Sequence, residues 1–157
     1  MEREPEDGAE RSTAERKADL RDELRARLER IDPDEARVPA HPEWFPGTVR
    51  QQLMNDPDTP EGIELIGVWF DAGSRTRPHV HPVDQVLQVV FGEGVVATET
   101  EKRVIRPGDW VVVPAGIWHW HGATPDSAMC HISIKQPCET DWSSPWGDWD
   151  SYMEGAA

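Results

Sequence analysis

The sequence predicts an all-β sandwich or barrel, for two reasons. Short apolar stretches recur between residue 62 and residue 134, and glycine and proline separate them. No helical pattern lies between these stretches. The chain has 157 residues, which is enough for one domain with a core of its own. We therefore expect one β domain over residues 38–157, preceded by a charged extension over residues 1–37.

The extension consists mainly of charged residues and has almost no β-branched or aromatic ones, which is typical of disorder in its first part. From Thr13 to Pro33 the pattern predicts a helix. Its apolar residues recur at helical spacing: Leu20, Leu24, Leu28 and Ile31. Because this stripe is narrow, the helix either lies on the β domain with its charged face in solvent or crosses to another subunit. The sequence leaves both possibilities open.

The β domain is expected to begin with an irregular segment, residues 38–60, whose five prolines surround the aromatic pair Trp44 and Phe45. Strands should then follow in order at residues 62–70, 83–91, 95–98, 103–105, 110–113 and 128–134. The tail contains three tryptophans: Trp142, Trp146 and Trp149. So many large aromatic side chains in a short span predict that the tail covers the barrel end, a subunit seam or the mouth of a ligand site.

Composition excludes several classes of function. The chain has 30 acidic and 16 basic residues, a net charge of −14, so neither nucleic acid nor an anionic membrane surface is an expected partner. No apolar run reaches the length of a membrane helix, and the charged N-terminus lacks a signal-peptide core. Cys130 and Cys138 match no zinc or redox spacing. We expect a cytoplasmic protein with two free thiols.

Three histidines and a glutamine form a candidate metal site. His79 and His81 are two residues apart, so on a strand both point to one face, and Gln85 has the same parity. His119 follows a strand-like run of valines. Three imidazoles and one amide oxygen are suitable ligands for a divalent transition metal, and all four are neutral. An ion held by them keeps its full double charge and is a strong Lewis acid.

Two blocks of the sequence resemble the two motifs of the cupin superfamily, and together they span roughly a third of the chain. The matching positions are Gly73, His79, His81 and Gly92 in the first block, and Gly108, Pro114, Gly116 and His119 in the second. Two positions depart from the pattern, since Gln85 stands where most cupins have a glutamate and Ala123 where many have an asparagine. The resemblance implies a double-stranded β-helix, also called a jelly-roll barrel, with one bound metal ion and a homodimeric or larger homo-oligomeric state.

Gln85 and the run from His119 to Pro125 are similar to a bacterial subgroup of small single-domain cupins. This subgroup includes hydroxynitrile lyases and cupins associated with carboxymuconolactone decarboxylases. In the hydroxynitrile lyases, histidines at the positions of His121 and His131 are implicated in handling the substrate hydroxyl proton or the cyanide. The resemblance therefore implies catalytic roles for these two residues.

Strand parity places His121 on the face of His119, and His131 at the centre of the last expected strand. Each is either a general acid/base beside the metal or a structural histidine, at the rim for His121 and in the core for His131. Lys135 shares the parity of His131, and we expect it to be an ordinary solvated lysine. Trp118 and Trp120 have the opposite parity and should pack between the sheets.

We expect a cupin that binds one divalent transition metal, Mn, Fe, Ni or Zn, with Mn or Fe favoured. The expected function is that of a small-molecule enzyme, a lyase acting next to a substrate oxygen on the metal, with a histidine base. Hydroxynitrile lyase is the named example. The alternatives are a metal-dependent dioxygenase and a non-catalytic module that binds a small metabolite or a metal.

Overall fold

The computed structural model describes residues 27–147 and 149–157. The contacts divide the chain into two units, Met1–Arg30 and Ile31–Ala157. Most of the predicted N-terminal helix lies outside the described residues, and its expected last part, residues 27–32, is not helical. The reason is local: Asp32 precedes Pro33, has an extended backbone, and caps the short 3-10 helix η1 (Pro33–Glu35) through Asp34 N.

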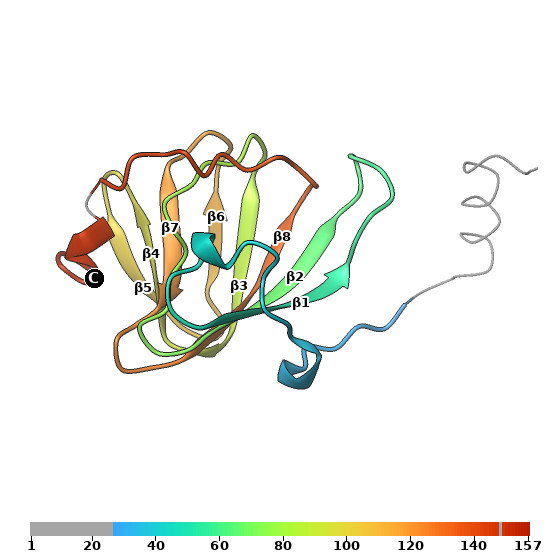
Figure 1. The fold of residues 1–157 in the computed structure, drawn as a ribbon, viewed down its shortest axis with the longest axis horizontal. Coiled ribbons are helices and arrows are strands. Elements are labelled where there is room, and N and C mark those ends of the chain that lie inside the picture. The colour runs from blue at the N-terminus through green and yellow to red at the C-terminus, as the bar shows by residue number, and fades with distance from the viewer. Residues whose placement is uncertain (1–26, 148) are drawn as a thin grey trace, which may run out of the picture. The chain divides into compact units, whose positions relative to one another are not determined.

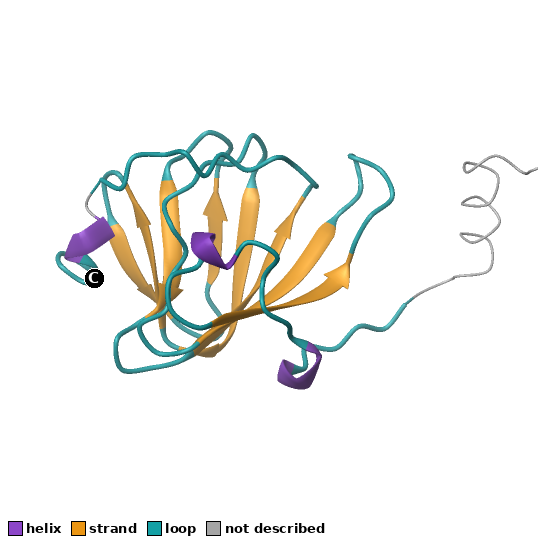
Figure 2. Cartoon of the chain, in the orientation of Figure 1, coloured by secondary structure: helices purple, strands orange, loops and turns teal. Residues whose placement is uncertain are grey.

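The second unit consists of two antiparallel sheets (Figures 1 and 2). The larger sheet has the strand order β1-β2-β8-β3-β6, and the smaller has the order β5-β4-β7. The strands are β1 (Val49–Asn55), β2 (Glu64–Phe70), β3 (Gln85–Gly92), β4 (Gly94–Thr98), β5 (Lys102–Ile105), β6 (Trp110–Val113), β7 (His119–Ala123) and β8 (Met129–Lys135). The helices of the described residues are single turns, η1, η2 (Pro42–Trp44) and η3 (Trp149–Ser151), and none is long and apolar enough to cross a membrane.

The all-β class and the double-stranded β-helix are confirmed. The motif glycines Gly73, Gly92, Gly108 and Gly116 all have positive φ angles, which explains why the turns between these strands need glycine. Two strands were not in the predicted list, since the prediction placed β1 in an irregular segment and gave no strand at β7, although it assumed strand parity for His119 and His121. In β1 the polar Gln52 is buried and Leu53 is exposed, so the strand lacks the apolar alternation that reveals a half-buried strand. Asp32 N donates to the Gln52 side chain at 2.8 Å, which explains why this amide is buried.

The segment after β2 lies along β7 and brings the first histidines to the smaller sheet. Arg75 is bridged to Gly122, and His79 to His119. Gly122 makes this approach possible, because a Cβ atom there would lie 2.4 Å from the Ser74 carbonyl oxygen. Beyond it, Val80 is bridged to Asp141 of the C-terminal segment, which in Figure 1 crosses over the ends of the strands towards η3.

The main core lies between the sheets and draws on strands of both. Its buried members are Val49, Val68, Phe70, Val89, Val96, Ile105, Ala123 and Met129. A second cluster, Val95, Ala97 and Trp120, has the opposite strand parity and is covered by Trp149, Tyr152 and Met153. The expectation that Trp118 and Trp120 pack between the sheets was therefore wrong. Trp120 is fully buried under the C-terminal segment, and Trp118 donates its indole N–H to Pro145 O at 2.7 Å.

Candidate metal centre

His79, His81 and His119 come together as predicted, and all three are buried. One ring nitrogen of each lies within 4.8 Å of those of the other two. The backbone explains this meeting. His79 N donates to His119 O at 2.9 Å and His119 N donates to His79 O at 3.1 Å, so the two residues face each other on adjacent extended segments. His81 has the parity of His79 and reaches the same point.

The hydrogen bonds of the ring Nδ1 atoms determine which nitrogen is free. His79 Nδ1 lies 2.7 Å from Arg77 O, and His119 Nδ1 lies 2.9 Å from Ile117 O. A carbonyl oxygen only accepts, so both Nδ1 atoms carry the hydrogen and both Nε2 atoms carry a lone pair. The His81 Nδ1 contacts the Thr140 hydroxyl at 2.9 Å, and its buried Nε2 has no hydrogen-bond partner. This arrangement orients ligand nitrogens towards a metal.

Gln85, the first residue of β3, completes the group. Its Oε1 lies 3.1 Å from His119 Nε2, and its amide Nε2 donates to Ser133 Oγ at 2.8 Å. In neutral His119 both contacting atoms are acceptors, so no hydrogen joins them. Two ligands on one metal ion, each about 2.1 Å from it, would be separated by about 3 Å. The contact therefore fits a shared cation.

Burial keeps these imidazoles neutral. Desolvation lowers the pKa of His81 to about 3 and that of His119 to about 4, and it lowers the pKa of His79 well below its usual value. The neighbouring histidines add to the shift for His79 and His81, since a charge on one disfavours a charge on the next. Neutral imidazoles and an amide oxygen form the kind of donor set that binds a divalent transition metal.

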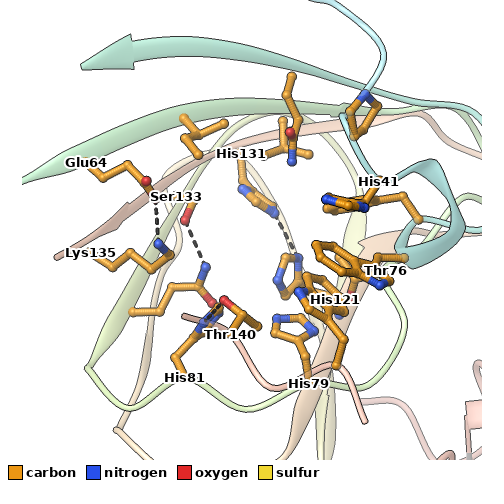
Figure 3. A pocket seen from close by; sticks show the side chains of 18 of the residues that line it. His41, Glu64, Thr76, His79, His81, His121, His131, Ser133, Lys135 and Thr140 are labelled. Carbon is orange, nitrogen blue, oxygen red and sulfur yellow. Dashed lines mark hydrogen bonds and ion pairs between the residues drawn. The ribbon is translucent and has the colours of Figure 1, made fainter. Parts of the chain in front are cut away.

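His121 and His131 lie beside this group as a hydrogen-bonded pair (Figure 3). His131 Nε2 is 2.9 Å from His121 Nδ1, and the two outer ring nitrogens, His121 Nε2 and His131 Nδ1, are buried without a partner. The His121 ring lies 5.5 Å from the His79 ring, whereas His131 packs against Phe70 at 5.4 Å. Desolvation lowers the pKa of both, to about 3 for His131. The pair is thus a buried, neutral donor and acceptor beside the three histidines.

One cavity of about 270 Å³ is lined by His79, His81, Gln85, His121 and His131, whereas His119 is fully buried and is not among its lining residues. Its mouth includes an aromatic stack whose ring contacts could not be predicted from the sequence. Trp142 contacts the His79 ring at a tilt, with 4.4 Å between the ring centroids, and stacks on Trp44 at 4.9 Å, and Trp44 stacks on His41 at 4.1 Å. The tail tryptophan Trp142 therefore covers the ligand mouth, one of the positions expected for it. His41 carried no sequence signal, because only the fold brings the 38–60 segment over the cavity.

Lys135 was wrongly expected to be a solvated lysine. It lines the cavity, its side chain is 10% exposed, and its Nζ lies 2.5 Å from Glu64 Oε1. The register explains the contact, since Lys135 of β8 is opposite Glu64 of β2 on one side and Gln85 of β3 on the other. The parity shared with His131 could have indicated this position.

Comparison with known proteins identifies the family. The sequence profile of the family described as "Cupin domain" matches residues 68–135. This range includes all five buried histidines: His79, His81, His119, His121 and His131. An (R)-mandelonitrile lyase of Granulicella tundricola is 40% identical over 105 residues, which cover 64% of this chain and 79% of that protein. The chain is a cupin.

Solved structures of other proteins resemble this cupin. A cupin-like protein of Thermotoga maritima matches with a TM-score of 0.65 and 28% identity, over 73% of this cupin and 89% of that chain. The polyketide cyclase RemF of Streptomyces resistomycificus matches with a TM-score of 0.62 but 16% identity, over 83% of this cupin and 100% of that chain. The second likeness concerns the fold alone.

Proposed function

We propose that this cupin is a metal-dependent hydroxynitrile lyase, which cleaves a cyanohydrin into a carbonyl compound and hydrogen cyanide or catalyses the reverse reaction. The observation that supports it is the neutral His121–His131 pair, which lines the same cavity as His79 and His81 of the three-histidine group. The 40% identity to a protein named (R)-mandelonitrile lyase supports it independently.

In this proposal His79, His81, His119 and Gln85 hold one divalent transition metal. Among the candidates, iron suits the imidazoles and manganese suits the amide oxygen. The ion supplies Lewis acidity, which lowers the pKa of a substrate hydroxyl. Because all four ligands are neutral, none of them would cancel part of the charge of the ion. The aromatic rings of Trp44 and Trp142 at the cavity mouth offer a surface for an apolar substituent of the substrate.

The histidine pair can take the hydroxyl proton. If His121 Nδ1 donates its hydrogen to His131 Nε2, His121 Nε2 carries a lone pair and is the base. When it accepts a proton, the hydrogen between the rings can pass to His131. The positive charge then moves to the ring that lies farther from the other histidines. This movement lowers the repulsion between an imidazolium and a nearby divalent cation.

The test is benzaldehyde release from mandelonitrile by protein loaded with manganese or iron, corrected for the uncatalysed reaction. Turnover should require the metal. His121→Ala and His131→Ala should each lower kcat by about a hundredfold, as expected for loss of a general base, while metal content stays normal. His41→Ala is the matched control, since His41 lines the same cavity but is exposed.

Each rival function predicts a different result. Consumption of dioxygen with a small-molecule substrate would replace the lyase by a dioxygenase. Binding of the cyanohydrin without turnover would indicate a non-catalytic module. Turnover within a few-fold of wild type in both metal-loaded histidine variants would refute the proposed base.

A further inference from the structure

The cavity wall contains one ion pair. Among its lining residues in the described chain, Lys135 is the only lysine or arginine and Glu64 the only acidic residue. Both are largely buried, with side-chain exposures of 10% and 18%. Burial of two charges costs several kcal/mol of desolvation for each, so such a pair is rarely retained for stability alone. A polar role inside the cavity would explain its presence.

The pair lies on one side of the cavity, and the aromatic mouth lies on another. In Figure 3 Lys135 and Glu64 are on the side away from His41 and Thr76, with the histidine pair between them. Strand register places Lys135 directly beside Gln85 of the candidate metal centre. A substrate bound between the two sides would meet aromatic rings at one end and the ammonium at the other.

The charges favour an anion at Lys135. An ammonium group has three N–H donors, and the ion pair with Glu64 uses one of them. Glu64 therefore fixes the lysine and leaves donors for a ligand. The other titratable residues that line the cavity in the described chain are histidines, and a histidine side chain does not carry a negative charge: His41, His79, His81, His121 and His131. They do not compete with an anion for the lysine.

We propose that Lys135 is the binding subsite for a small monoanionic group attached to, or leaving, the carbon that bears the substrate oxygen. In the proposed lyase reaction, on which this assignment rests, the group is cyanide. The hydroxyl proton passes to the histidine pair, the O–H electron pair forms the carbonyl bond, and the carbon–carbon bond to the nitrile breaks. Its electron pair leaves on cyanide beside the Lys135 ammonium. Cyanide then takes the proton back from the histidine pair and departs as hydrogen cyanide, with no net redox change.

The test compares two uncleaved analogues of equal shape and different charge, 2-hydroxy-2-phenylacetate and its neutral amide, titrated calorimetrically into the metal-loaded protein at pH 7. Wild type should bind the anion more tightly. Lys135→Met should weaken binding of the anion roughly tenfold, because it removes a charge-assisted hydrogen bond, and change amide binding by less than about twofold. Lys135→Arg should retain the preference.

Glu64→Gln provides a test of opposite sign, because it removes the competing carboxylate and leaves the lysine. Affinity for the anion should rise. Arg103→Met is the matched control: it removes the same charge from a residue that does not line the cavity and whose side chain is 68% exposed. The subsite would be overturned if the ratio of anion affinity to amide affinity were equal in wild type and Lys135→Met. It would also be overturned if the affinity for the anion fell in Glu64→Gln.

The subsite and the lyase activity fail separately. A charge preference that disappears in Lys135→Met, in a protein that does not cleave mandelonitrile, supports the subsite and refutes the lyase. If the protein cleaves mandelonitrile but Lys135→Met leaves the ratio of anion affinity to amide affinity unchanged, the subsite is refuted and the lyase is supported.

Discussion

At the scale of single residues, Gln85 sets the charge of the proposed metal centre. Its amide oxygen faces His119 Nε2, and its amide nitrogen is held by Ser133. A glutamate at this position would add one negative charge to an otherwise neutral group of ligands. It would also lie opposite Lys135 on the neighbouring strand and attract its ammonium away from Glu64.

We predict that Gln85→Glu binds the metal as tightly as wild type or more tightly, and that its lyase kcat falls. The anionic ligand strengthens cation binding but reduces the Lewis acidity that the reaction needs. The measurements are the metal dissociation constant, from competition with a chelator, and the turnover of mandelonitrile. Gln51→Glu, which adds the same charge to the cavity lining from β1, is the control. Faster turnover in Gln85→Glu would contradict the neutral-ligand argument.

Several site residues could be predicted because their position depends on local rules. The two-residue spacing of His79 and His81 placed both on one face, and parity placed His121 beside His119 and His131 in the cavity. The residues that the analysis missed depend on long-range packing instead. Thr140 reaches His81 only because Asp141 pairs with Val80, and no local pattern indicates that bridge.

At the scale of elements, the C-terminal segment 138–142 acts as an added edge strand over the first histidines. Val80 N donates to Asp141 O at 3.0 Å, and Asp141 N donates to Val80 O at 2.9 Å. These bonds place the Thr140 hydroxyl against His81 Nδ1 and the Trp142 ring against His79. His81 differs here from His79 and His119, whose Nδ1 atoms are held by backbone carbonyls.

We predict that Thr140→Val, which keeps the shape and removes the hydroxyl, weakens metal binding by about tenfold, a typical effect of removing the hydrogen bond behind a ligand histidine. Thr140→Ser keeps a hydroxyl and should bind metal almost as wild type does. Chelator competition measures both constants. Equal metal affinity in Thr140→Val and wild type would show that the backbone alone positions His81.

The strands themselves were predictable where apolar alternation and glycine turns agree, as in β2 to β6 and in β8. The prediction listed no strand at β7, although it used strand parity for His119 and His121. It also missed β1, whose core-facing positions include a glutamine that accepts a hydrogen bond from the amide of Asp32, far away in sequence. The second cluster around Trp120 was misplaced for a related reason. Parity assigned Trp120 to the face opposite the histidines, but it did not reveal that the C-terminal segment covers that face.

At the scale of the whole molecule, the buried histidines make folding depend on pH. His79, His81, His119, His121 and His131 are each at most 5% exposed. Burial lowers the pKa of each, to about 3 for His81 and His131 and to about 4 for His119. In the unfolded chain the same side chains take up protons below about pH 6.5. The metal-free unfolded state therefore binds more protons than the native state between about pH 6.5 and these lower values.

Because the unfolded state binds the extra protons, the free energy of unfolding must fall as the pH falls through this window. Each fully neutral native histidine contributes a slope of about 1.4 kcal/mol per pH unit. We predict that the metal-free protein is most stable above pH 6.5 and unfolds sharply in mild acid. In His131→Leu the slope should be smaller by about 1.4 kcal/mol per pH unit, because one buried histidine is removed. Urea unfolding of the metal-free protein at a series of pH values between 4 and 8 measures the slopes. A wild-type free energy of unfolding that does not change from pH 7 to pH 5 would show that these histidines are not held neutral by the fold.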